Sequence, residues 1–215
     1  MRKKLLKHVF FMVCTMALGM MITSCGSMGV SSNGGIPTEE QLSIASAALG
    51  DDIRSLSVSV DGVVCQFPMN TGDMIDNGWY FDNDVKKNLE SIPGNTLVAP
   101  AVTMRKNAAD GYAATSCAVQ PVNKGTSEIS LEESMLYNVV FSKSDGVTVI
   151  LPGGITWDST FDEAKEAYHP TEEEAVDMNG IKYILIRSKD NHYSVQINFN
   201  STDDKVERIE FSGRL

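Results

Sequence analysis

The chain has 215 residues, and its 28 Asp and Glu outnumber its 18 Lys and Arg, which gives a formal net charge of −10. Nucleic-acid binding depends on clustered Lys and Arg that meet phosphates, so this composition argues against a nucleic-acid partner. The length is sufficient for one large domain or two small ones.

Residues 1–24 have the pattern of a secretory signal peptide. Positive charges at Arg2, Lys3, Lys4 and Lys7 precede a largely apolar run of 14 residues, Val9 to Ile22. A helix needs about 20 apolar residues to cross a bilayer, so this run is too short for a membrane span and has the length of a signal-peptide core. The alternative is a buried hydrophobic helix that ends in Cys.

The run ends in Ile22-Thr23-Ser24-Cys25, which resembles the lipobox of bacterial lipoproteins. The resemblance implies that signal peptidase recognises Ile22, Thr23 and Ser24. It also implies that the Cys25 thiol receives a diacylglycerol and that cleavage makes Cys25 the first residue. Two or three acyl chains hold a protein stably on a membrane. We therefore expect a lipid-anchored protein of the cell membrane that faces away from the cytoplasm.

Residues 25–37 are rich in Gly and Ser and carry no charge, a composition typical of a flexible linker. Removal of the signal peptide leaves 14 of the 18 basic residues against all 28 acidic ones, a formal charge of −14. Anionic lipid headgroups repel such a body, which fits a tethered domain better than one that lies on the membrane. Simple solubility is the alternative explanation of the charge.

Two cysteines, Cys65 and Cys117, remain beyond Cys25. Thiols outside the cytoplasm can form a disulfide, and a bridge over this loop would contribute about 4 kcal/mol in the chain-entropy model. Both cysteines also lie in apolar alternations, where free thiols are buried as small hydrophobic side chains. The sequence leaves both alternatives open.

Residues 38–144 predict a first unit of helix and antiparallel strands. Thr38 to Gln41 matches a capping box, and Gly50 can end the helix that follows. Alternating apolar residues on both sides of Asp61-Gly62 predict a hairpin. Further segments follow in chain order: a short helical turn between Gly72 and Gly78, then strands over 97–105, 112–122 and 135–141.

Residues 145–215 predict a second unit of the same kind. A strand ends at Pro152, Thr160 and Glu163 form another capping box, and the helix 161–168 stops before Pro170. The acidic run 172–174 reads as a solvated loop. Strands are predicted over 181–187, 192–199 and 206–211, so the expected fold class is α+β, with two tandem units after the signal peptide and linker.

The two units begin with similar letters, "DGVVCQFP" from Asp61 and "DGVTVILP" from Asp145. Duplication of one structural unit would explain both this match and the order of elements. The alternative is that any strand following a hairpin turn has this pattern.

The segments "GGITWDSTFDEAKEAYHP", "YILIR", "YSVQINF" and "KVERIEF" resemble the BamE (SmpA/OmlA) lipoproteins and the related β-lactamase-inhibitor-protein fold. That resemblance begins at Gly146 and implies short helices with a three-stranded antiparallel sheet. The whole chain looks still more like uncharacterised lipoproteins of Gram-positive gut anaerobes. The family usually has Gly where this chain has Asp158, and no partner-contact motif aligns.

No motif of a hydrolase, zinc protease or phosphate-binding loop occurs, and His169 and His192 are expected at the surface. The acidic residues within Phe81 to Glu90 suggest calcium, but Lys86 and Lys87 occupy positions where a calcium loop needs an oxygen ligand and Gly. We therefore expect no catalytic residue, no metal and no cofactor.

Trp79, Tyr80 and Phe81 follow one another, so they cannot all face one core. Trp79, Tyr80 and Trp157 are therefore the candidate binding surface, with packing in the core as the alternative. The sequence thus predicts a non-enzymatic lipoprotein of the cell envelope that binds another envelope or extracellular protein or acts as a structural module. The alternative is an inhibitor or chaperone-like partner of an exported enzyme, by analogy of fold.

Overall fold

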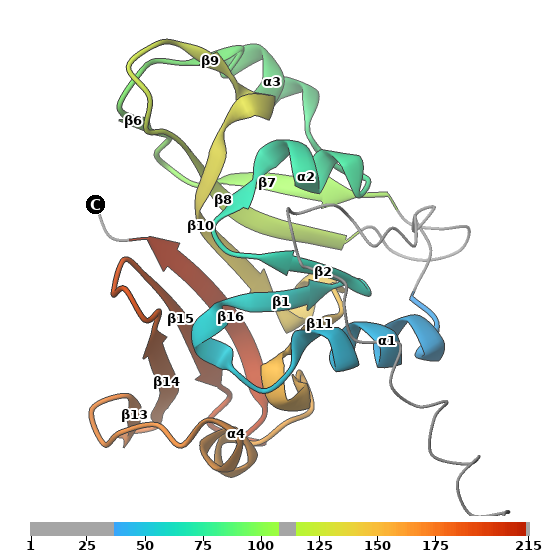
Figure 1. The fold of residues 1–215 in the computed structure, drawn as a ribbon, viewed down its shortest axis with the longest axis vertical. Coiled ribbons are helices and arrows are strands. Elements are labelled where there is room, and N and C mark those ends of the chain that lie inside the picture. Colours follow the sequence, from blue (N-terminus) through green and yellow to red (C-terminus); the bar gives the residue numbers. More distant parts are fainter. Residues whose placement is uncertain (1–36, 108–114, 214–215) are drawn as a thin grey trace, which may run out of the picture.

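The computed structural model describes residues 37–107 and 115–213. The predicted signal peptide, Cys25 and all but the last residue of the linker lie outside this part of the chain. None of the helices in the described ranges has the length and apolar character needed to cross a membrane. The fold is mixed α+β and consists mostly of antiparallel sheet (Figure 1).

The helices and strands follow one another closely along the chain. The α-helices are α1 (Glu39–Leu49), α2 (Thr71–Asp76), α3 (Asn83–Asn88) and α4 (Phe161–Tyr168), and the 3-10 helices are η1 (Ile53–Ser55), η2 (Leu131–Glu133), η3 (Lys143–Asp145) and η4 (Pro152–Gly154). The first strands are β1 (Ser57–Val60), β2 (Val63–Gln66), β3 (Met69–Asn70), β4 (Trp79–Phe81), β5 (Ser91–Ile92), β6 (Thr96–Leu97), β7 (Val102–Lys106) and β8 (Thr115–Asn123). The remaining strands are β9 (Ile129–Ser130), β10 (Met135–Ser142), β11 (Val149–Leu151), β12 (Ile155–Thr156), β13 (Ala175–Met178), β14 (Ile181–Arg187), β15 (Tyr193–Phe199) and β16 (Val206–Gly213).

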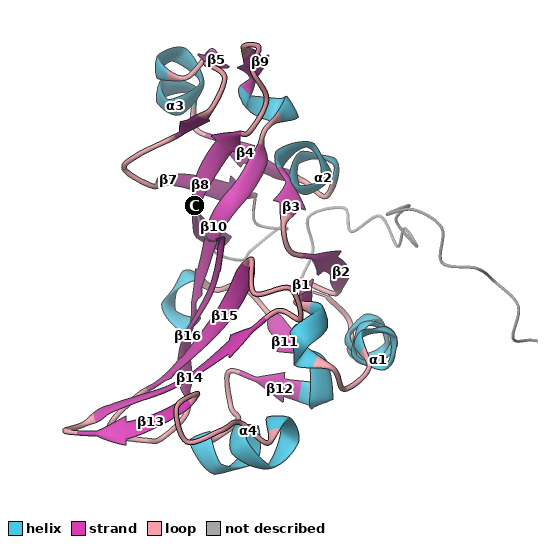
Figure 2. Ribbon diagram, turned by 60° about the vertical axis from the view of Figure 1, so that its left-hand side comes forward, coloured by secondary structure: helices cyan, strands magenta, loops and turns pink. Residues whose placement is uncertain are grey.

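Two sheets carry the architecture. The small sheet has the order β12-β11-β1-β2, and the large sheet runs β13-β14-β15-β16-β10-β8-β7-β4, with β3 and β6 attached to β10 and β8. Figure 2 shows the large sheet nearly edge-on, with the small sheet and helices α1, α2 and α4 on the same side of it. Buried side chains of both sheets form one hydrophobic core between them.

Both predicted capping boxes are present and begin the two longest helices. Thr38 accepts from the backbone N–H of Gln41, and Thr160 accepts from that of Glu163. The predicted hairpin is also confirmed, because β1 and β2 pair on both sides of Asp61-Gly62. At both of these turn residues φ is positive, and glycine adopts such a backbone without strain.

The boundary predicted near residue 144 does not separate two sheets. Strand β1 pairs with β11 in the small sheet, and β10 pairs with β16 in the large sheet. Each of these pairs joins a strand before residue 144 to a strand after it. The two expected units therefore share both sheets and one core. In each sheet, a strand from one half of the chain pairs directly with a strand from the other half.

The two similar "DGV" stretches lie on opposite sides of one strand. Val60 of β1 is opposite Val63 in β2 and opposite Val149 in β11. Letter-by-letter alignment instead matches Val63 with Val147. The register is thus shifted by two residues from the alignment of the letters, and the duplication of a structural unit stays a prediction.

Candidate functional site

The large sheet has two chemically different faces, since successive side chains of a strand point to opposite sides. One face is apolar and fully buried in the shared core; it includes Ile184, Ile186, Val195, Ile197, Val139, Ile209 and Phe211. The residues that alternate with these along the same strands are half-buried or exposed. They form the opposite face of the sheet, which we call the open face. Its central members are Tyr183, Leu185, Gln196, Asn198, Arg208, Glu210, Ser212, Asn138, Val140, Ala118 and Gln120.

Strand register places the polar side chains of the open face in rows across neighbouring strands. Ser194 is opposite Ser212, Ser212 is opposite Asn138, and Asn138 is opposite Gln120. Neighbouring strands are about 4.8 Å apart, so this row of four uncharged polar side chains spans roughly 14 Å. The surface can therefore offer hydrogen bonds at regular spacing to one extended contact.

Glu210 is the centre of a hydrogen-bond network on the open face. Its Oε1 accepts from Asn138 Nδ2 at 3.0 Å, and its Oε2 accepts from Arg208 Nη2 at 2.8 Å. The Ser212 hydroxyl donates to the same carboxylate at 3.4 Å. The carboxylate is thus held by three neighbours, and this arrangement suits binding better than proton transfer.

Asn138 contributes an unusual acceptor to this network. Its Oδ1 is shielded from solvent and has no hydrogen-bond partner in the structure, although buried polar atoms usually have one. The sequence offered no sign of this site, because only the pairing of β10 with β16 brings Asn138 to Glu210.

The candidate binding surface predicted from aromatic residues is wrong for Trp79. This side chain is only 2 % exposed and belongs to the core, as does Phe81. Tyr80, between them, is half-buried on the other side of β4 and therefore lies at the end of the open face. Trp157 is half-buried and packs against the core, and its Nε1 donates to the Val147 carbonyl at 2.7 Å. The three side chains do not form one surface.

The structure contains no disulfide between Cys65 and Cys117. Cys117, on β8, points into the core and is 1 % exposed, whereas Cys65 is half-buried on the edge strand β2 of the small sheet. Burial is the main cause that raises the pKa of the Cys117 thiol, with a smaller contribution from nearby Asp145 and Asp61. The alternative interpretation, a buried thiol that packs as a hydrophobic side chain, holds for Cys117.

A shallow, open groove of about 480 Å³ lies beside α4 and is lined by residues from 153 to 167. Two of its three acidic side chains, Asp158 and Glu163, have partners. Asp158 contacts Lys143 and Lys205, each at 3.3 Å, and these ammonium groups lower its pKa. Glu163 is held in the capping box of α4. Both carboxylates therefore serve the local structure, and the described residues contain no cluster suited to hold a metal ion.

The segment Phe81 to Glu90, considered for calcium, forms the end of β4 and helix α3. Its Asp82 accepts from Arg105 Nε at 2.9 Å. His169 and His192 are both exposed, as predicted.

The interpretation of residues 172–174 as a solvated loop is wrong for Glu174. Its side chain is 11 % exposed and binds Arg54 through both carboxylate oxygens, at 3.0 and 3.1 Å.

Comparisons of the chain with protein-family models, with curated proteins and with solved structures found no match.

Proposed function

We propose that this protein is a lipid-anchored, extracytoplasmic lipoprotein that acts as a non-enzymatic binding module of the cell envelope, with the open face as its contact surface. The observation that carries the proposal is the regular polar surface around Asn138 and Glu210, on a sheet whose other side is an apolar core. The lipobox-like Ile22 to Cys25 supports the anchor. The resemblance to BamE-type lipoproteins from Gly146 onward belongs to the same proposal.

The anchor is tested with Cys25→Ser in the native cell. The natural protein should incorporate labelled fatty acid and sediment with membranes, whereas the variant should do neither, because the thiol is the acceptor of the lipid. Mass spectrometry of the natural protein would contradict the proposal if it found an unacylated chain in the cytosol that still begins with Met1.

The contact surface is tested with a photoreactive amino acid in place of Gln196, at the centre of the open face. The matched control carries the same group in place of Glu40, which is exposed on α1. Irradiation of living cells should yield a discrete crosslinked product from position 196 and none from position 40. The proposal fails if the two positions give the same products or if position 196 gives none.

The hairpin β13–β14 favours a second candidate function, that of an inhibitor or chaperone-like partner of an exported enzyme. Its tip carries Met178 and Ile181, which are 63 % and 61 % exposed. A projecting apolar tip of this kind could enter a cleft of an enzyme. A crosslink from position 178 to an exported enzyme, with inhibition of that enzyme by the purified chain, would favour this function over the first.

A further inference from the structure

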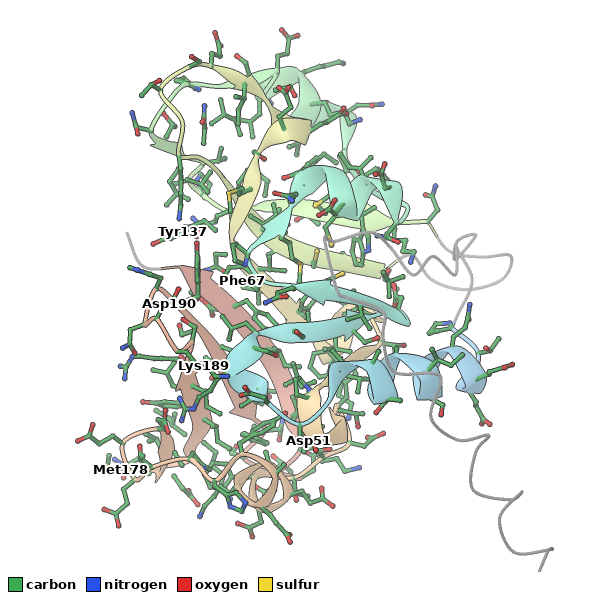
Figure 3. All side chains as sticks on the ribbon, viewed as in Figure 1. Asp51, Phe67, Tyr137, Met178, Lys189 and Asp190 are labelled. Carbon is green, nitrogen blue, oxygen red and sulfur yellow. The ribbon has the colours of Figure 1, made fainter. Side chains whose placement is uncertain are left out.

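Strands β13 and β14 form a hairpin that extends beyond the rest of the large sheet (Figure 2). Its two turn residues, Asn179 and Gly180, have φ of 56° and 78°, as in the type I′ turn that closes two-residue hairpins. Met178 and Ile181 pair across the strands directly before and after the turn. Figure 3 shows Met178 at the outer end of the molecule, away from the other labelled residues.

Strand β13 is the edge of the large sheet, and among the described strands it pairs only with β14. The Leu185 N–H donates to the Glu174 carbonyl at 2.8 Å. This bond fixes which residues of β13 form hydrogen bonds with β14, because every second residue of an antiparallel strand does so. By antiparallel alternation, Val176 and Met178 then bond toward β14, and the N–H and C=O of Asp177 point away from it. An edge of this kind accepts a further strand.

The side chains along this edge divide by face. Val176 and Met178 lie on the same face of the hairpin as Ile181, and they form an apolar strip. Asp177 lies on the opposite face, where it contacts Lys182 at 3.5 Å. Glu172 and Glu173, both exposed, lie three and two residues before the strand, and buried Glu174 separates them from it. The edge therefore combines an apolar face with a face on which the outermost charged group is Asp177, next to Lys182.

We propose that β13 binds an extended segment of a partner protein as an added strand, and that this segment alternates apolar with basic residues. Its apolar side chains would cover Val176 and Met178, and its Lys or Arg would face Asp177. Backbone hydrogen bonds give affinity in this mode of recognition, and the alternate side chains give specificity. The inference names a partner chemistry for the binding role proposed above, at the β13 edge of the sheet, where Val176 lies on the same side as Tyr183 of the open face.

The acidic groups near β13 favour a basic segment over two other binding partners, a second copy of the chain and an anionic lipid surface. A second copy of the chain, paired edge to edge, would bring Asp177 and the preceding glutamates close to identical groups, and such like-charge pairs are unfavourable. An anionic lipid surface would repel the same carboxylates. A basic segment instead places opposite charges across the strands while it covers the apolar strip.

The test uses the purified full chain and a fluorescent peptide, Lys-Val-Lys-Val-Lys-Val, titrated at low salt and followed by anisotropy. Asp177→Pro should weaken binding at least tenfold, because it removes the outward N–H and the charge. Proline is tolerated at an edge position whose N–H points to solvent, so the pairing with β14 should persist. Peptides with Glu in place of Lys, or with N-methylated amides, should bind at least tenfold more weakly to the natural chain.

Asp177→Lys gives a second variant that keeps the N–H and does not depend on tolerance of proline. It should weaken binding of the Lys-Val peptide and strengthen that of the Glu-Val peptide. Circular dichroism and thermal melts establish that both variants fold.

The proposal is overturned if the natural chain does not bind the Lys-Val peptide or binds both peptides equally. It is also overturned if the natural chain, but not Asp177→Pro, dimerises in light scattering or binds vesicles of phosphatidylglycerol. This assay does not depend on the lipid anchor, and its variants change only Asp177 on β13, not the centre of the open face at position 196. A negative result here therefore leaves the crosslinking test at position 196 unaffected, and the two proposals fail independently.

Discussion

Glu174 connects two distant parts of the chain through a single carboxylate. It binds Arg54 of η1, and it also accepts from the backbone N–H of Thr171 at 3.0 Å. Arg54 in turn donates through Nη1 to the Arg187 carbonyl at the end of β14. Burial alone would raise the pKa of Glu174, but the hydrogen bonds from Thr171 and Arg54 hold it below its ordinary value of 4.5.

Glu174→Gln should therefore lower the free energy of unfolding at pH 7 by about 1–2 kcal/mol, because charge-assisted hydrogen bonds are lost. A carboxyl whose pKa is depressed by folding stabilises the protein above its unfolded pKa, and that contribution disappears as pH falls through the folded value. The difference in unfolding free energy between the natural and variant chains should have its largest value above about pH 5 and should decrease as the pH falls below 4.5. Urea titrations at several pH values measure it.

The matched control is Glu172→Gln, which removes the same charge from an exposed neighbouring position. Its effect should be within about 0.5 kcal/mol of zero, as for most surface substitutions. Equal effects of the two variants, or a Glu174→Gln effect that does not change with pH, would contradict the role of the Arg54 contact.

The two cysteines of the fold should differ in reactivity, because only Cys117 is buried in the core. Thiols react as thiolates, and burial both raises the pKa of Cys117 and blocks access to it. In the native protein, N-ethylmaleimide should modify Cys65 at least tenfold faster than Cys117, and in urea the two rates should converge. Peptide mass spectrometry distinguishes the sites, and a Cys65–Cys117 disulfide peptide in a non-reducing digest would contradict the structure.

Helix α4 depends on a cap that the sequence already indicates. The Thr160 side chain accepts from the Glu163 N–H, and Glu163 Oε2 accepts from the Thr160 N–H at 2.8 Å. The helix buries Phe161, Ala164 and Tyr168 in the core, so loss of the cap affects packing as well as the helix end. Thr160→Ala should cost about 1 kcal/mol of unfolding free energy, whereas Thr160→Ser keeps the hydroxyl and should cost less. Equal losses in urea titrations would show that the cap does not stabilise α4.

Capping boxes and alternating apolar residues predicted most of the longer helices and strands. The contacts between distant parts of the chain depend on how the strands pair, which these patterns do not show. Capping boxes identified α1 and α4, and alternation identified β14 with its observed bounds, Ile181–Arg187. The same signals could not show that Glu174 meets Arg54, 120 positions away in the chain, or that Asn138 lies beside Glu210. Trp79 was misassigned because alternation shows that neighbouring aromatic residues face opposite sides, but not which side is the core.

At the scale of the whole molecule, the two halves of the chain complete each other. Phe67, just after β2, packs against Tyr193 and Phe211 of the large sheet, with ring centroids 5.5 and 5.6 Å apart. Between β1 and β11, the Asp61 backbone N–H donates to the Thr148 carbonyl at 2.8 Å, and the Thr148 N–H donates to the Asp61 carboxylate at 3.0 Å. The same carboxylate contacts the buried Lys106 ammonium at 3.5 Å. Both halves of the chain therefore contribute side chains to one core.

The chain from residue 38 onward should therefore unfold in one cooperative transition, with coincident curves from tryptophan fluorescence and far-ultraviolet circular dichroism. A fragment of residues 145–215 should not fold alone, because β11 would lose β1, β16 would lose β10, and Phe211 would lose the cover of Phe67. Dispersion of amide resonances in its NMR spectrum measures this directly. Mixing this fragment with residues 38–144 should restore dispersed resonances if the shared sheets can assemble from two chains. A dispersed spectrum from the isolated fragment, or two separate transitions in the whole chain, would instead favour two independent units joined in tandem.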